Sequence, residues 1–173
     1  MEDPDPPHFR EIYESAVVDK IPVTIVEGCR GSGRSSIINQ LILNSSFYSS
    51  KSSSCSIPEF VCNLGAWLSR SPILKSYADI LTKNEEKESL LKLEECIKHD
   101  ALHVFCTSIA EPLLQLNCSD QGCLVIAVDG TDEAEFHRSE DGRSIGWFLQ
   151  ATRSECSSAI CPCWFNLRGK GAV

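Results

Sequence analysis

A loop rich in glycine and serine directly follows an apolar run near the amino terminus. The apolar run covers residues 21–26, and the loop reads Gly28-Cys29-Arg30-Gly31-Ser32-Gly33-Arg34-Ser35. In a phosphate-binding loop, backbone N–H groups freed by glycines converge on phosphate oxygens at the start of a helix. The loop therefore predicts a nucleotide site. Its predicted binding residues are Gly28, Gly31, Ser32, Gly33, Arg34, Ser35 and Ser36.

Arg34 departs from the loop pattern G-x-x-x-x-G-K-[ST], which asks for lysine at this position. The compact lysine ammonium reaches the β and γ phosphates, whereas the guanidinium is planar and wider. We therefore expect nucleotide binding with little or no hydrolysis. Ser35 supplies the hydroxyl that holds Mg²⁺ in this pattern. The alternative is that a Gly/Ser-rich turn matches the pattern by chance.

An acidic stretch follows a second apolar run. Residues 123–128 are continuously apolar, as in a strand buried on both faces of a parallel sheet, and Asp129 comes next. Asp129 would hold Mg²⁺ beside Ser35, and Asp132 or Glu133 would orient or deprotonate a water. The predicted metal ligands are thus Ser35 and Asp129, the predicted catalytic residues are Glu133 and Asp132, and the predicted cofactor is Mg-ATP. ATP and GTP are not distinguished.

The composition excludes several classes of partner. The chain of 173 residues has a formal net charge of −8 and no basic stripe, so nucleic-acid binding is not expected. Neither a secretory signal nor an apolar run of spanning length is present, which favours a cytosolic protein with reduced cysteines. Cys156, Cys161 and Cys163 include no CxxC pair, so no structural metal is expected.

One domain over residues 9–167 accounts for most of the chain, after a disordered acidic lead (1–8) and before a truncated tail (168–173). A serine-rich loop is expected at 44–56, and the charged run 83–88 is expected to be a solvated connector. Trp67, Trp147 and Trp164 are assigned to the core. Apolar residues at helical spacing predict helices at 9–19, from about 34, from about 57, and at 73–81, 90–97, 104–116 and 144–152.

The fold class expected from these patterns is α/β: a short, incomplete parallel sheet with helices on both faces. The strands that start at Ile21 and Cys123 should be adjacent or nearly so, and ligand should bind at their carboxyl ends.

Several segments resemble the TANC family of scaffold proteins, which carry tetratricopeptide and ankyrin repeats. The similar segments are residues 129–138 with Asp141-Gly142, 57–61, 69–71 and 111–113. The resemblance implies a STAND/AAA-like, NACHT-related P-loop NTPase domain in three layers. It also implies a cytoplasmic scaffold of the postsynaptic density and dendritic spines, with protein partners bound through regions that this chain lacks.

Three departures from the family pattern limit that interpretation: Arg34, a missing second strand before the helix at Pro58, and the end of the chain after Leu167. They suggest a fragment, a splice form or a gene-model artefact. The main hypothesis is a nucleotide-binding regulatory module. A degenerate, nucleotide-free protein-interaction domain is the alternative, and a slow ATPase using Glu133 is the third.

Overall fold

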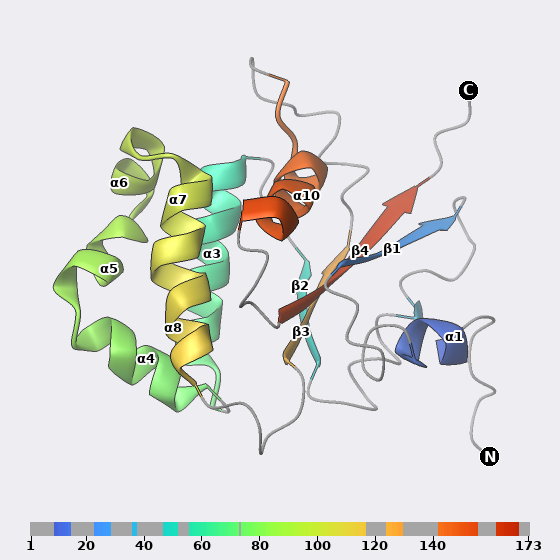
Figure 1. The fold of residues 1–173 in the computed structure, drawn as a ribbon, viewed down its shortest axis with the longest axis horizontal. Helices are drawn as coiled ribbons and strands as arrows, with labels where there is room; N and C mark the ends of the chain where they lie inside the picture. The colour runs from blue at the N-terminus through green and yellow to red at the C-terminus, as the bar shows by residue number, and fades with distance from the viewer. Residues whose placement is uncertain are drawn as a thin grey trace.

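The computed structural model describes residues 9–14, 23–28, 36–37, 47–51, 56–72, 74–116, 124–129, 142–155 and 162–169. Figure 1 shows a group of helices beside a small sheet. The strands are β1 (Val23–Gly28), β2 (Phe47–Lys51), β3 (Leu124–Asp129) and β4 (Pro162–Gly169). The helical elements are α1 (Phe9–Tyr13), α3 (Ile57–Arg70), α4 (Lys75–Thr82), α5 (Glu85–Leu90), α6 (Leu93–Lys98), α7 (Ala101–Phe105), η2 (Cys106–Ala110), α8 (Glu111–Gln115) and α10 (Ile145–Glu155).

The described strands form a four-stranded parallel sheet in the order β1-β4-β3-β2. The strands of the two predicted motifs, β1 and β3, therefore do not touch, because β4 lies between them. The largely apolar segment 164–167, near the end of the chain, belongs to this central strand.

The fold class expected from the sequence, a three-layer α/β P-loop NTPase fold with helices on both faces of the sheet, is wrong for the described residues. The core residues whose burial is described come mostly from helices, and Ile126 and Val128 of β3 are the described members from a strand. Figure 1 places α3 to α8 together on one side of the sheet, and α10 contacts both α3 and β1. Apolar stripes of short helices bury one another in this core.

Phe148 of α10 is central to this helical core. Its ring meets Phe60 edge to face at 6.0 Å and Phe105 at 5.6 Å, and it is fully buried. Edge-to-face pairs of this kind add to the stabilisation that burial alone provides. The three rings therefore tie α3, α7 and α10 together.

Helix α3 confirms the helix predicted from about residue 57. Ser56 caps it by accepting a hydrogen bond from the Glu59 N–H, at 3.3 Å, and by donating its hydroxyl hydrogen to the Glu59 carboxylate, at 2.8 Å. Pro58 lies in the first turn, where its missing N–H costs nothing. One face of α3 is buried, and Trp67 packs against the core as predicted.

The segment between α4 and α7 differs from its prediction. The charged run 83–88, predicted to be a connector, is largely helix α5, which begins where the Asn84 side chain accepts a hydrogen bond from the Lys87 N–H at 3.2 Å. The helix predicted at 90–97 is interrupted at Leu91 and Lys92, and α6 starts only at Leu93. Leu91 packs closely against Gly65, since a β-carbon at Gly65 would lie 2.8 Å from the Leu91 side chain.

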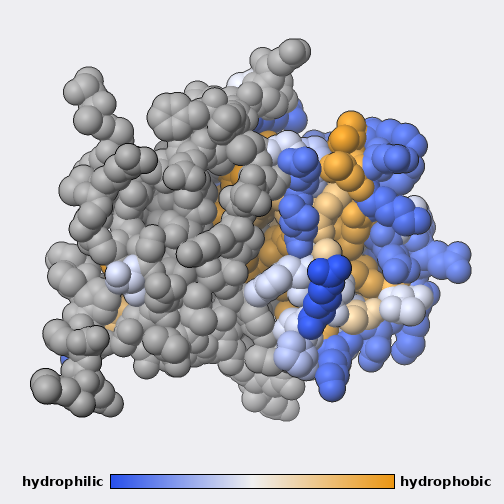
Figure 2. Space-filling view, turned by 180° about the vertical axis from the view of Figure 1, so that it is seen from behind, coloured by the Kyte–Doolittle hydropathy of each residue, from blue (hydrophilic) through white to orange (hydrophobic). Residues whose placement is uncertain are grey.

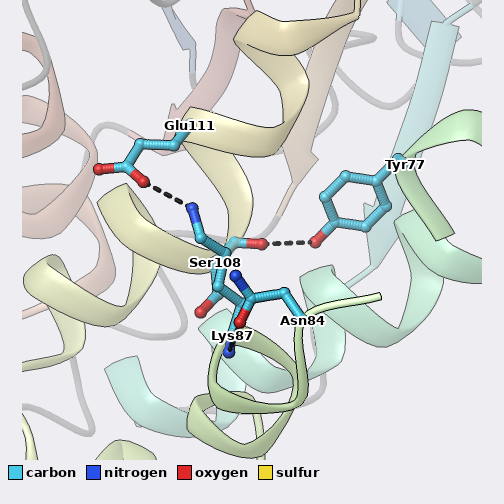
Figure 3. A network of polar contacts seen from close by, with 5 residues as sticks. All are labelled: Tyr77, Asn84, Lys87, Ser108 and Glu111. Atoms are coloured by element: carbon cyan, nitrogen blue, oxygen red, sulfur yellow. Dashed lines mark hydrogen bonds and ion pairs between the residues drawn. The ribbon is translucent and has the colours of Figure 1, made fainter. Parts of the chain in front are cut away.

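The helix predicted at 104–116 contains a π-helical turn, η2, just before Pro112. Proline lacks an N–H and its ring clashes with the carbonyl four residues earlier, which here belongs to Ser108. The widened turn relieves that clash, and the Tyr77 hydroxyl donates to the Ser108 carbonyl oxygen at 3.0 Å (Figure 3). The Lys87–Glu111 ion pair, at 2.6 Å, joins α5 to α8 in the same region.

Two further expectations about the sheet are wrong. Residues 44–56, predicted to be a serine-rich loop, contain β2, so the sheet does have a strand before α3. The truncated tail was predicted to begin at 168, but Arg168 and Gly169 pair with Glu27 and Gly28 inside the sheet. The lead over residues 1–8 lies outside the described residues.

Candidate functional site

The carboxyl ends of β1 and β3 lie at the same edge of the parallel sheet. Ile25 of β1 and Val128 of β3 both align with Asn166 of the intervening β4. Strands are spaced about 4.8 Å apart and rise about 3.3 Å per residue, so Gly28 and Asp129 end within about 12 Å of each other. The carboxyl ends of β1 and β3 therefore lie at one edge of the sheet, with β4 between them.

The predicted nucleotide-binding residues are only partly described. Gly28 is the last residue of β1, and Asp129 is the last residue of β3. Ser36 is exposed and helical, next to the buried Ile37. The predicted residues outside the described part of the chain are Gly31, Ser32, Gly33, Arg34, Ser35, Asp132 and Glu133.

Lys51 is a residue at this edge that the sequence analysis missed. It ends β2 and is the register partner of Asp129 in β3. The edge therefore carries both an acidic residue, the type that binds Mg²⁺, and a basic residue, the type that pairs with phosphate. Phe47 and Tyr48 were the available signal, because aromatic residues favour strands.

A cavity of about 620 Å³ lies elsewhere, among the helices. It is bounded by the starts of α3, α7 and α10 and by the end of α6. Trp147, predicted to be a core residue, is instead 39% exposed at this cavity and carries the Arg143 guanidinium 4.7 Å from its ring centre. Arg143 lies just before α10 and Trp147 lies in its first turn, so their closeness in the sequence was the available signal.

Two free cysteines lie between α3 and α6. Burial is the main cause that raises the pKa of the Cys62 thiol. Burial also raises the pKa of the Cys96 thiol to about 12. Cys96 also donates to the Pro58 carbonyl oxygen at 3.8 Å. These residues fit the expectation of reduced thiols, whereas Cys106 belongs to a disulfide.

The described part of the chain contains no group of three or more acidic, histidine or cysteine side chains placed to hold a metal ion. Within the same residues, no helix has the length and apolar character needed to cross a bilayer.

No protein-family model matches the chain, and no solved structure matches it. The resemblance to the TANC family therefore stays a prediction from the quoted segments.

Proposed function

We propose that this chain binds a magnesium–nucleotide complex at the edge where β1 and β3 end, and that binding regulates the protein with little or no turnover. The observation that carries the proposal is the shared register of β1 and β3 on β4. It brings Gly28 and Asp129 to one edge, and in the sequence these residues begin a glycine-rich segment suited to phosphate and an acidic segment suited to Mg²⁺.

Each residue of the proposed site has a distinct role. Gly28 and the residues up to Ser36 would surround the phosphates, and Asp129 with Ser35 would hold the ion. Arg34 supplies positive charge without the compact ammonium of lysine, which is the reason to expect binding without efficient hydrolysis. Asp132 and Glu133 are the candidates for any residual hydrolysis.

A titration with a fluorescent ATP analogue and Mg²⁺ tests this proposal. Asp129→Ala should weaken binding about tenfold or more, because about 1.4 kcal/mol of ion binding is lost. Asp79→Ala is the matched control, since Asp79 is exposed on α4. The proposal fails if the wild type shows no saturable binding, or if Asp129→Ala binds as well as Asp79→Ala.

Two variants separate this proposal from its alternatives. Arg34→Lys should restore the ammonium, and strong binding that appears only in Arg34→Lys would favour the nucleotide-free interaction domain. Glu133→Gln addresses the slow ATPase, since phosphate release by the wild type that disappears in this variant would support a catalytic role. We expect no measurable release from either protein.

We also propose that the module belongs to a cytoplasmic, postsynaptic scaffold that resembles the TANC family. The support is the set of similar segments, in particular residues 129–138. Sequencing the full transcript tests this directly, because a reading frame that continues into ankyrin repeats is expected. A reading frame without repeats would refute the scaffold assignment and leave nucleotide binding to be judged separately.

A further inference from the structure

The cavity among the helices has the size and the lining of a small-molecule site. Its volume of about 620 Å³ falls within the range of about 300–1,000 Å³ that is typical of such sites. Apolar side chains from three elements line it: Ile57 and Pro58 at the start of α3, Ala101 and Leu102 at the start of α7, and Phe148 of α10.

The charged part of the lining is mainly basic. It contains Lys98, His99 and Arg143 and a single carboxylate, Asp100, although the whole chain has a net charge of −8. Lys98 pairs with Glu95 at 2.6 Å, and Arg143 lies over the Trp147 ring, which also lines the cavity. The cavity thus combines apolar walls with a cationic group at its opening.

Arg143 is held in position at this opening. Its guanidinium lies 4.7 Å from the ring centre of Trp147, and its Nη1 atom lies 3.8 Å from the Asp100 Oδ1 atom. That N–O distance is too long for a hydrogen bond, so the attraction between the two side chains is purely coulombic. An anion with good hydrogen-bond geometry would compete with Asp100 for the guanidinium.

Apolar residues also reach the surface of the helical part. The large exposed apolar side chains include Ile97, which is 64% exposed and lines the cavity. Figure 2 shows an apolar band across the helical part, bordered by hydrophilic residues. Ile97 and Trp147 add exposed apolar surface to the lining of the cavity itself.

We propose that this cavity binds a small apolar anion, with its apolar body against α3, α7 and α10 and its anionic group on Arg143. Octanoate is the probe of choice because it combines an alkyl chain with a carboxylate. Octanol lacks the charge and acetate lacks the alkyl chain. The three probes therefore separate the contribution of the apolar walls from that of the anionic group on Arg143.

Calorimetric titration of the full chain tests the proposal. Octanoate should saturate one site, and octanol and acetate should each bind about tenfold more weakly or worse. Arg143→Gln should weaken octanoate about tenfold and leave octanol unchanged. Its control is Arg70→Gln, because Arg70 is an exposed basic residue outside the lining.

A second variant fills the cavity. Ala101→Leu should abolish binding of both octanoate and octanol, whereas Ala66→Leu, at an exposed position of α3, should not. Circular dichroism checks that both variants keep their helices.

The proposal is overturned if wild-type octanoate binding is not saturable, if octanol binds as tightly, or if Arg143→Gln behaves like Arg70→Gln. Mg-ATP should not compete with octanoate, because the two proposed sites are separate. A negative result at one site therefore does not bear on the other.

Discussion

Replacing Tyr77 with phenylalanine removes one hydrogen-bonding hydroxyl from the centre of the helical core. Tyr77 is fully buried, and its hydroxyl donates to the Ser108 carbonyl oxygen at 3.0 Å (Figure 3). In a regular α-helix that carbonyl would accept from the N–H four residues on, but residue 112 is a proline. The Tyr77 hydroxyl therefore takes the place of the N–H that Pro112 lacks. The variant removes this donor from the Ser108 carbonyl.

We expect Tyr77→Phe to lower the free energy of unfolding by about 2 kcal/mol, since a buried polar group left unsatisfied costs about 1–3 kcal/mol. For a chain of this length, that loss lowers Tm by about 4–8 °C. Tyr13→Phe is the matched control, because Tyr13 is only half-buried on α1. Calorimetry or thermal circular dichroism measures both variants.

Pro112→Ala tests the cause of the loss. It restores an N–H at position 112, so Tyr77→Phe should cost less in a Pro112→Ala background, and the double-mutant cycle should show coupling of about 0.5 kcal/mol or more. Additive effects of the two changes, or a Tyr77→Phe variant as stable as Tyr13→Phe, would refute the reasoning.

Burial also makes the contribution of Tyr77 depend on pH. Desolvation raises the pKa of Tyr77 above its ordinary value, so the folded protein keeps a proton that the unfolded chain loses above about pH 10. This contribution to stability is complete below that pH and is lost as pH rises further. The stability difference between the wild type and Tyr77→Phe should therefore narrow above about pH 10.

Three further predictions address other parts of the helical core. Ser56→Ala removes the cap of α3 and should lower the free energy of unfolding by about 1 kcal/mol. Ser76→Ala, at an exposed site on α4, should leave it unchanged, and urea unfolding measures both variants. Phe148→Ala should lower the free energy of unfolding by about 3–5 kcal/mol, because it empties the space between Phe60 and Phe105. A loss of stability no greater than that of Phe148→Leu would contradict this packing. Cys96 should resist iodoacetamide at pH 8 in the folded protein and react in denaturing urea, because burial raises the pKa of its thiol to about 12. Peptide mass spectrometry measures the labelling, and equal labelling in both states would contradict the burial of Cys96.

Helical spacing predicted the stronger helices well. The patterns behind α3, α4 and α10 each place apolar residues on one face, and local capping at Ser56 agrees with the pattern. The break at Leu91 and Lys92 and the helix α5 at 85–90 were missed. The charged side chains of α5 hide its helical pattern, and it is stabilised by the Asn84 cap and by the ion pair of Lys87 with Glu111.

Features that depend on distant parts of the chain were less predictable. Serines in β2 have weak strand propensity, and the strand depends on its pairing with β3. The helical core could not be inferred from the two motif strands, because it is assembled from helices whose mutual packing leaves no local signature. Likewise, Lys51 meets Asp129 only through the register of β2 on β3.

Paramagnetic broadening by Mn²⁺–ATP tests the central claim most directly. Mn²⁺ takes the place of Mg²⁺, and it broadens the NMR signals of nearby backbone amides. Gly28, Lys51 and Asp129 should lose intensity first, and amides of α5 should be unaffected. Absence of broadening at the ends of β1 and β3, or broadening centred on Arg143 and Trp147, would contradict nucleotide binding at the shared edge of the sheet.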